Sequence, residues 1–462
     1  MKSRILIWFR RDLRLADNSA LRAAIDLKAE IIPVYIWSPS EENPWAPGAA
    51  SKWWLHESLT SLSKDLHKRG SRLILKTGSS LASLQGLISE TKATSVYWNR
   101  LYDPAITRRD EMIKSKLIKD GVETKSFNSG LLYEPWTLQT KTKKPYQVFT
   151  PFYNAATSIN PEPAIGAAPS KISAPQTWPK SEPLESLDLL PRPRWDKKLT
   201  KYWAPGEGGA SKSLDRFLSG PVSTYIIDRD VPELRGTSRL SPHLHFGEIG
   251  PRQIWNLTKT SMKETKNTSY RKSADWFLRE IMWREFAHHV LFNFKHTSEE
   301  PLRSDFQKFP WLQDADTYQR WKLGKTGVPI VDAGMRELYE TGWMHNRVRM
   351  IVASFLTKHL LISWLEGARW FWDSLVDADL SNNSMGWQWA GGCGADAAPY
   401  FRIFNPLLQG EKFDPAGTYV RKWVPEIAHI PNSKIHQPIN PVIELKAGRD
   451  RALEAFEEFR GN

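Results

Sequence analysis

One stretch of the chain places three chemically useful side chains at helical spacing. Residues 275–286 read DWFLREIMWREF, in which Glu280, Trp283 and Arg284 are three and four positions apart. On a helix these positions share one face. A carboxylate there could stabilise charge that develops on a ligand, and the indole could form an apolar wall. The competing interpretation is a surface Glu–Arg pair beside a core tryptophan, which helices often contain.

A second candidate set lies in residues 341–350, which read TGWMHNRVRM. Asn346, Arg349 and Met350 would share a helix face. An amide, a guanidinium and a thioether together are unusual for a simple core stripe. The alternative is a methionine in the core with the arginine reaching solvent.

Two further segments have compositions that suit a ligand better than a core. Residues 377–389 read DADLSNNSMGWQW, which predicts a polar, aromatic loop between helices that could clamp a ligand. Residues 399–406 read PYFRIFNP and interleave aromatic rings with an arginine. Proteins use that composition to stack bases and hold phosphates.

Positioning these residues needs more than one domain, because the chain has 462 residues and single cores rarely exceed about 250–300. Residues 1–130 alternate helical periods with short apolar runs at 5–9, 31–37, 73–75 and 96–98. Strands separated by helices imply a parallel sheet covered on both faces. We therefore predict a doubly wound, Rossmann-like α/β domain, whose ligands would sit beyond the carboxyl ends of the strands.

The rest of the chain is predicted to be a linker followed by helices. Residues 131–199 are expected to be an interdomain linker, rich in Pro, Ser and Ala from about residue 154. Residues 200–462 are expected to form an all-helical domain without a convincing strand, ending in one short amphipathic helix after residue 438. Apolar residues recur at helical spacing in 273–294, 318–323, 331–341, 347–361 and 368–375.

The composition narrows the class of partner. Lys and Arg total 64 against 51 Asp and Glu, a net charge of +13, which favours a polyanionic partner, although a basic surface can also serve solubility. The single cysteine, Cys393, excludes a disulfide framework, a four-cysteine zinc site and a protein-bound iron–sulfur cluster. No metal site is expected, since His288 and His289 would point to different helix faces. The 22 tryptophans are a marked excess and could pack, stack or carry electrons.

Membrane insertion and export are not indicated by the sequence. The chain lacks an apolar run of the roughly 18 residues that a bilayer span requires. The first residues lead straight into a strand-like run, without a signal-peptide pattern. We expect a cytoplasmic protein with no membrane partner.

Taken together, these segments resemble the cryptochrome/photolyase family over nearly the whole chain, and within it the microbial class I and class III photolyases of cyclobutane pyrimidine dimers. Six motifs carry the resemblance in the family's order: WFRRDLR at 8–14, GTSRLSP at 236–242, WREF at 283–286, GWMHNR at 342–347, GWQW at 386–389 and YFRIFNP at 400–406. The resemblance implies FAD in the helical domain, an antenna pigment in the α/β domain and UV-damaged DNA as partner.

The resemblance also implies which residues hold FAD. By position in the family pattern they are Tyr225, Thr237, Ser238, Arg239, Leu240, Ser241, Phe277, Glu280, Arg284, Asn346, Arg349, Asp377, Asp379 and Asn383. The first six would hold the phosphates, since free N–H groups at a helix start suit an anion. Asn383 would face flavin N5, where an amide favours the electron-rich reduced flavin. The chain departs from the family in having Phe277 for a frequent Trp. It also has Asn382-Asn383-Ser384-Met385-Gly386 before Trp-Gln-Trp, where Asn-Asn-Gly-Gly is usual.

The implied reaction is light-driven electron transfer from reduced FAD to a flipped-out dimer, which reopens without net redox change. Catalysis would fall to Glu280, Trp283, Asn346 and Met350. Glu280 would stabilise the dimer anion, while Asn346 would orient the dimer. DNA would be held by Arg229, Trp283, Arg347, Trp389 and Arg402.

Three tryptophans match the family's electron relay between flavin and surface: Trp387, Trp364 and Trp311. Ordinary helix packing is the alternative for the last two.

Two rival activities are weighed against dimer repair. A (6-4) photolyase needs a proton-donating histidine at the active-site end of the segment where this chain has Met350, so cyclobutane dimers are favoured. A cryptochrome would use the same flavin for signalling. The presence of Glu280, Trp283 and Met350 and the lack of a long C-terminal extension favour repair. A helical nucleic-acid binder without photochemistry would leave Tyr225, Asp377 and Asp379 unexplained.

The antenna is expected near strand ends and helix starts of the α/β domain. Candidate residues there are Trp8, Arg10, Arg11, Asp12, Trp53, Trp54, Trp98 and Asn99. Methenyltetrahydrofolate is favoured over a deazaflavin. The protein is expected to act as a monomer without an obligate protein partner.

Overall fold

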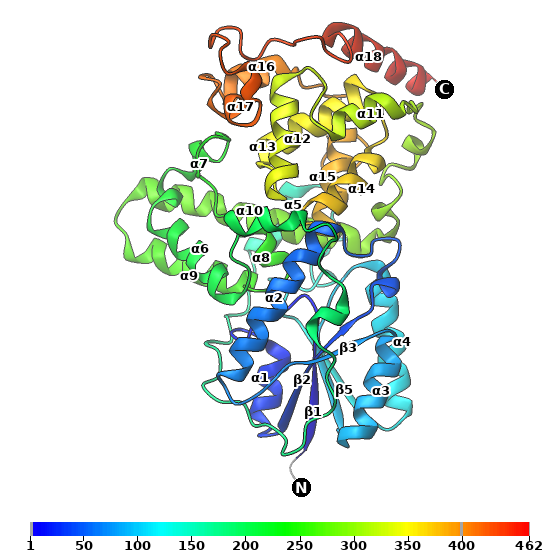
Figure 1. The fold of residues 1–462 in the computed structure, drawn as a ribbon, viewed down its shortest axis with the longest axis vertical. Coiled ribbons are helices and arrows are strands. Elements are labelled where there is room, and N and C mark those ends of the chain that lie inside the picture. The colour runs from blue at the N-terminus through cyan, green and yellow to red at the C-terminus, as the bar shows by residue number, and fades with distance from the viewer. Residues whose placement is uncertain (1–2, 398–400, 462) are drawn as a thin grey trace. The chain divides into compact units, whose positions relative to one another are not determined.

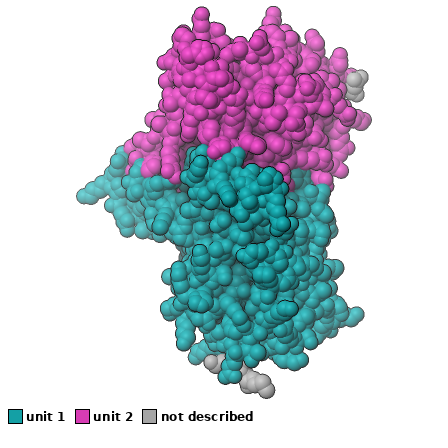
Figure 2. Space-filling view, viewed as in Figure 1, with its two compact units in different colours: residues 1–138, 155–220, 238–268 teal, residues 139–154, 221–237, 269–462 magenta. Residues whose placement is uncertain are grey.

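The computed structural model describes residues 3–397 and 401–461 (Figure 1). The chain forms two compact units, coloured separately in Figure 2. Unit 1 comprises residues 1–138, 155–220 and 238–268. Unit 2 comprises residues 139–154, 221–237 and 269–462. No helix in the described ranges combines the length and the apolar character needed to span a membrane.

Unit 1 is built on five parallel strands in the order β3-β2-β1-β4-β5. Their bounds are β1 Arg4–Phe9, β2 Glu30–Trp37, β3 Ile74–Thr77, β4 Ser95–Asn99 and β5 Glu123–Phe127. Leu6 of the central strand aligns with Ile32 on one side and Val96 on the other. This sheet confirms the predicted Rossmann-like domain. Strand β5 was not predicted, because ETKSF is a partly exposed edge strand without an apolar run.

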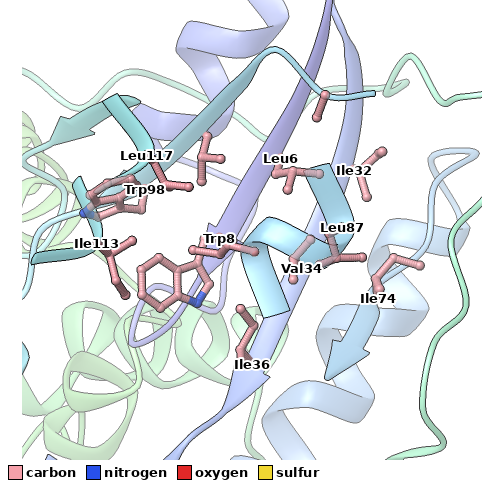
Figure 3. Close-up of a cluster of buried hydrophobic side chains, with 13 residues drawn as sticks. Leu6, Trp8, Ile32, Val34, Ile36, Ile74, Leu87, Trp98, Ile113 and Leu117 are labelled. Carbon is pink, nitrogen blue, oxygen red and sulfur yellow. The ribbon is translucent and has the colours of Figure 1, made fainter. Parts of the chain in front are cut away.

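The core of unit 1 lies between the sheet and two of its helices. The helices that follow the strands are α1 (Ser19–Asp26), α2 (Ala49–His67), α3 (Ser80–Thr91) and α4 (Pro104–Lys119). Figure 3 shows Leu6 and Trp8 of β1 facing Leu87 of α3 and Ile113 of α4. Each such side chain stabilises the fold by about 1.5–3 kcal/mol when fully buried. This packing fixes the carboxyl ends of β1 and β4.

The segment expected to be a free linker belongs largely to unit 1. Residues 155–220 are mostly irregular, yet their peptide groups bond to the sheet: Ile31 N donates to Ser173 O at 2.8 Å, and Glu182 N donates to Leu75 O at 3.0 Å. Trp178 packs against the sheet core. The observed units therefore follow other boundaries than 1–130, 131–199 and 200–462. A chain without periodicity can still cover an open sheet edge such as β3.

The remaining helices of unit 1 are α6 (Glu207–Ser219), α8 (Ser241–His245) and α9 (Pro251–Glu264), and α5 (Phe149–Thr157) spans the residues where the two units divide. The helices of unit 2 are α7 (Tyr225–Asp228), α10 (Thr268–Asn293), α11 (Ala315–Lys322), α12 (Pro329–Thr341), α13 (Asn346–Ser354), α14 (Trp364–Ser374), α15 (Leu380–Gly391), α16 (Pro406–Phe413), α17 (Thr418–Trp423) and α18 (Leu445–Gly461). Between α13 and α14 lies a π-helical turn, η7 (Phe355–His359). These elements confirm the predicted helical character.

One expected loop is a helix. Residues 377–389 were predicted to form a loop, but α15 begins at Leu380 because Asp379 accepts a hydrogen bond from Asn382 N at 2.9 Å. This N-cap satisfies an otherwise free donor and offsets the low helix propensity of the Ser and Asn residues that follow. Gly367 of α14 faces α15, and a Cβ there would lie 2.2 Å from the Trp387 ring. Only glycine permits this close approach.

The C-terminal helix makes stability sensitive to acid. Arg451 of α18 donates to the His359 carbonyl at 2.7 Å, and His359 is 2% exposed. Burial, assisted by Arg451, lowers the His359 pKa from 6.5 to about 4. Below pH 6.5 the unfolded chain binds a proton that the folded chain refuses, so stability falls as pH drops toward 4. At pH 5 the loss from this group is about 2 kcal/mol.

Thermal melts of wild type and His359→Gln at pH 7 and pH 5 measure this effect. The wild-type melting temperature is expected to fall by several degrees more than that of the variant. Equal decreases would show that other groups dominate.

Candidate active site

Unit 2 contains a cavity of about 530 Å³, within the usual range for small-molecule sites. Helices α10, α13 and α15 supply most of its wall. Twelve of the predicted site residues line it: Arg229, Glu280, Trp283, Arg284, Asn346, Arg349, Met350, Asp377, Asp379, Asn383, Trp387 and Trp389. Two helix faces recognised in the sequence therefore meet at one cavity.

Arg229 and Glu280 form an ion pair at the part of the cavity lining that α10 supplies. The Arg229 guanidinium donates to Glu280 Oε1 at 2.5 Å and lies 5.5 Å from the Tyr225 ring. Burial lowers the pKa of Arg229, but the nearby Glu280 carboxylate raises it further, so the net change is upward. The arginine therefore stays charged. Glu280 is partly exposed, and its charge has a partner before any ligand arrives.

Trp283 is fixed by stacking on one side. Its ring lies 3.6 Å from that of Phe149, with only 7° between the planes. Phe149 belongs to α5, in a segment that the sequence assigned to the linker. Its position is held by Asp396, whose Oδ1 accepts from Phe149 N at 3.1 Å. Phe149 and Asp396 are functional candidates that the sequence did not reveal, because neither follows a periodic pattern.

A second ion pair joins α13 to the segment before α15. Arg349 donates to both carboxylate oxygens of Asp377 at 2.8 and 3.0 Å and to Met344 O at 2.7 Å. The Asp377 side chain is only 3% exposed, so its charge depends on Arg349. Asp379 caps α15 and lies 3.5 Å from His288.

Two amides on the cavity wall differ in their contacts. Asn383 Nδ2 donates to Ala368 O at 2.9 Å, which fixes the orientation of the amide and leaves Oδ1 as the group available to a ligand. Asn346 is exposed at the start of α13, with no protein hydrogen bond to its side chain within residues 3–397 and 401–461. It can therefore bond to a ligand without breaking a protein contact. The unusual residue Met385 also lines the cavity.

The predicted phosphate-holding residues are not part of this cavity wall. Tyr225 is buried against Phe277, with the rings 5.7 Å apart. Thr237 belongs to unit 2, whereas Ser238, Arg239, Leu240 and Ser241 belong to unit 1. Within unit 1 the Arg239 guanidinium lies 5.7 Å from the Trp203 ring, and Ser241 begins α8.

The three relay tryptophans are graded in exposure. Trp387 lines the cavity and is 3% exposed, Trp364 is equally buried at the start of α14, and Trp311 is partly exposed. Leu312 N donates to Leu361 O at 2.8 Å, which holds Trp311 beside the segment that leads into Trp364. This order, from cavity toward solvent, suits electron transfer.

The residues predicted to contact DNA differ in whether their side chains already bind another protein group. Arg347 donates to Asp230 Oδ1 at 2.8 Å, so a phosphate would have to replace that carboxylate. Arg402 is exposed, with its guanidinium 5.6 Å from the Phe404 ring. Trp389 lies 6.2 Å from the same ring. Pro399 and Tyr400 of this segment lie outside the described residues.

Most of the antenna candidates are buried in unit 1, and several of them contact one another. Trp8 packs edge-on against Trp98 at 5.8 Å and lies 4.5 Å from the Arg10 guanidinium. Asn99 donates to Asp12 at 2.6 Å. The other contacts of the set are Arg10 with Asp110, Arg11 with Asp103 and Glu42, and Trp54 with Glu248 and Trp53. Side chains from unit 1 itself therefore fill the carboxyl ends of β1 and β4.

In the described part of the chain, no group of three or more His, Cys, Asp or Glu side chains is arranged so that it could hold a metal ion. Cys393 is fully buried, and burial raises the pKa of its thiol to about 12. A protonated, inaccessible thiol is a packing residue rather than a nucleophile.

Comparison with known proteins gives consistent matches along the chain. The family model "DNA photolyase" matches residues 5–170, and "FAD binding domain of DNA photolyase" matches residues 277–458. Deoxyribodipyrimidine photo-lyase of Agrobacterium fabrum is 45% identical over 472 residues, covering 98% of this chain and 97% of the relative. Cryptochrome-2 of Arabidopsis thaliana is 40% identical, covering 97% of this chain and 74% of the relative. The crystal structure of a bacterial class III photolyase from Agrobacterium tumefaciens matches with a TM-score of 0.95 at 44% identity, covering 100% of this chain and 98% of that one.

Proposed function

The chain belongs to the DNA photolyase family, and from this premise we propose that it is a deoxyribodipyrimidine photo-lyase that reopens cyclobutane pyrimidine dimers in UV-damaged DNA. The observation that carries the proposal is the cavity in unit 2. Its lining contains two groups of residues: Glu280, Trp283 and Asn346, and Asn383 with the Arg349–Asp377 pair. The first group suits a polar, ring-shaped lesion and the second suits a flavin.

The second group of residues, Asn383 with the Arg349–Asp377 pair, fits the isoalloxazine ring of FAD. The free Oδ1 of Asn383 can accept a hydrogen bond from a ring N–H, as a reduced flavin requires. The Arg349–Asp377 pair supplies both a donor and an acceptor for ring carbonyl and N–H groups. When bound and reduced, FAD supplies the light-driven electron. Roles in holding its phosphates are proposed for Tyr225, Thr237, Ser238, Arg239, Leu240 and Ser241.

The first group of residues, Glu280, Trp283 and Asn346, is proposed to contact the lesion. Trp283, stacked on Phe149, offers a rigid apolar surface to the flipped pair, and Met350 and Trp389 add apolar contact. Extracting the dimer costs little because its bases stack and pair badly. The unpartnered amide of Asn346 can then orient the pyrimidine edges without losing a protein contact.

Different polar contacts are proposed for the two members of the ion pair, Glu280 with the lesion and Arg229 with a DNA phosphate. Glu280 is assigned a hydrogen bond to a pyrimidine carbonyl oxygen, where negative charge develops, and its ion pair with Arg229 orients the carboxyl group. Arg229 is assigned a contact with a DNA phosphate. Arg347 and Arg402 bind further phosphates, which makes affinity fall as salt rises.

Replacing Glu280 by alanine is expected to slow repair by roughly 10-fold to 100-fold, because the donor to the developing charge is removed. FAD content should stay near that of wild type. Glu280→Gln keeps an N–H donor and should remain closer to wild type. Rates of repair under limiting light, with flavin absorbance measured in parallel, test this. Unchanged repair in the alanine variant would remove Glu280 from catalysis.

The proposed function itself is tested with anaerobically reduced holoprotein and an oligonucleotide carrying one cyclobutane thymine dimer. Light-dependent recovery of thymine absorbance, with a dark control, is the expected result. Failure of wild type to repair this substrate, with FAD bound, would overturn the proposal. The same assay on (6-4) DNA then separates a (6-4) enzyme from a cryptochrome.

The antenna and the assembly state complete the proposal. An antenna pigment is proposed in unit 1, with methenyltetrahydrofolate preferred to a deazaflavin, and the absorption spectrum of purified protein distinguishes the two. The protein is proposed to act as a monomer. Sedimentation with and without lesion DNA tests this.

A further inference from the structure

A buried carboxylate lies behind the start of α13, outside the cavity lining. Glu337 of α12 is 4% exposed, and its Oε2 accepts two hydrogen bonds. The backbone N–H of His345 donates at 3.2 Å, and the hydroxyl group of Tyr419 in α17 donates at 2.7 Å. A buried acid is costly unless hydrogen bonds satisfy it. Glu337 thus joins α12 and α17 to the residue that precedes α13.

The residue that Glu337 holds comes directly before Asn346, the amide proposed to orient the dimer. His345 is the N-cap of α13: its Nδ1 accepts from Arg347 N at 3.2 Å, and its carbonyl accepts from Arg349 N at 2.9 Å. Asn346 is the first residue of the helix and lines the cavity. Because consecutive residues share a rigid, planar peptide group, a contact that fixes His345 also limits where the Asn346 amide can lie.

The partners of Glu337 are themselves fixed. The fully buried carboxylate of Asp414 accepts from Tyr419 N and Val420 N, each at 3.0 Å, which sets the start of α17. Thr341 Oγ1 donates to the Glu337 carbonyl at 2.8 Å. Glu337 is therefore held through both its side chain and its backbone.

The two functional side chains of α13 have different anchors. Arg349, proposed to face the flavin, donates to Asp377 and to the Met344 carbonyl. Asn346, proposed to face the lesion, adjoins the residue that Glu337 holds. Loss of the Glu337 contacts should therefore disturb the lesion contact more than the flavin contact.

We propose that Glu337 is a positioning residue for lesion recognition: together with Tyr419, it sets the start of α13 so that the Asn346 amide meets the pyrimidine edges of a flipped dimer. The carboxylate does not line the cavity and acts through the backbone of His345. This inference rests on the proposed function, which assigns Asn346 to the dimer.

The affinity of FAD-loaded protein for a duplex carrying one dimer, divided by its affinity for the same duplex without damage, tests this role. Glu337→Ala is expected to lower this ratio about tenfold, the effect of losing about one hydrogen bond. Binding of the undamaged duplex should change less than about twofold, because phosphate contacts dominate it. Glu337→Gln keeps an acceptor oxygen and should restore most of the ratio.

Tyr419→Phe removes only a hydroxyl group, so it tests the same contact if Glu337→Ala folds poorly. It is expected to lower the ratio about threefold, with the FAD content of wild type. Tyr133→Phe is the matched control. It removes the hydroxyl group of another buried tyrosine, which donates to Ala156 O at 2.9 Å in unit 1, and should leave the ratio unchanged.

A double-mutant cycle shows whether Glu337 acts through Asn346. If it does, Glu337→Ala combined with Asn346→Ala lowers the ratio no further than Asn346→Ala alone. Additive losses, or an unchanged ratio in both Glu337→Ala and Tyr419→Phe, would overturn the inference. Light-driven repair of the duplex dimer by wild type is measured separately. Its absence would instead refute the proposed function.

Discussion

Protein carrying Asp377→Ala is expected to emerge from purification almost free of FAD. Asp377 is 3% exposed and compensates the charge of Arg349 through two hydrogen bonds. Removing one partner of a buried ion pair typically costs about 3–5 kcal/mol, because the other charge is left uncompensated. If that cost falls on the flavin-bound state, FAD affinity drops by roughly 100-fold to several thousand-fold.

Titration of apoprotein with FAD, followed by flavin fluorescence, measures this loss. Asp373→Ala, which removes an exposed carboxylate near the end of α14, is the matched control and should bind FAD normally. Thermal melts of both apoproteins separate folding from binding. Wild-type FAD affinity in Asp377→Ala, with only a lower melting temperature, would assign the ion pair to stability alone.

The second large effect is expected from Trp364→Phe, which should nearly abolish photoreduction while sparing repair by chemically reduced enzyme. In the proposed relay Trp364 comes after Trp387, which lines the cavity, and before the partly exposed Trp311, and Trp364 itself is buried. Phenylalanine fills most of the space but is far harder to oxidise, so electrons would no longer pass. The folded structure and the cavity should be unaffected.

Illumination of oxidised holoprotein with an external electron donor, followed by flavin absorbance, provides the measurement. Trp372→Phe makes the same exchange at another buried position of α14 and should photoreduce normally. Photoreduction at the wild-type rate in Trp364→Phe would exclude this residue from the relay. Equal inhibition in both variants would indicate a general loss of packing.

The sequence predicted those parts of the fold whose residues follow a simple period. The apolar runs of β1, β2, β3 and β4 indicated a parallel sheet, because fully buried strands are apolar on both faces. Strand β5 was not predicted, because this edge strand, with exposed Glu123 and Lys125, contains no apolar run. α15 was mistaken for a loop because Ser, Asn and Gly have low helix propensity. The capping carboxylate of Asp379 decided the conformation there.

The candidate site was predictable to a similar extent and for a similar reason. Glu280, Trp283, Asn346 and Met350 follow helical spacing on two helices, so their convergence could be expected. Phe149 could not, because its role depends on a stack with a residue 134 positions away.

The stack of Phe149 on Trp283 has a directional consequence. Phe149 covers one side of the indole, so a ligand can use only the opposite side. The two halves of a dimer are distinct, because one precedes the other in the 5′ to 3′ sense. A flipped pair that packs on Trp283 would therefore meet the indole from its open side, while the side covered by Phe149 stays closed to it.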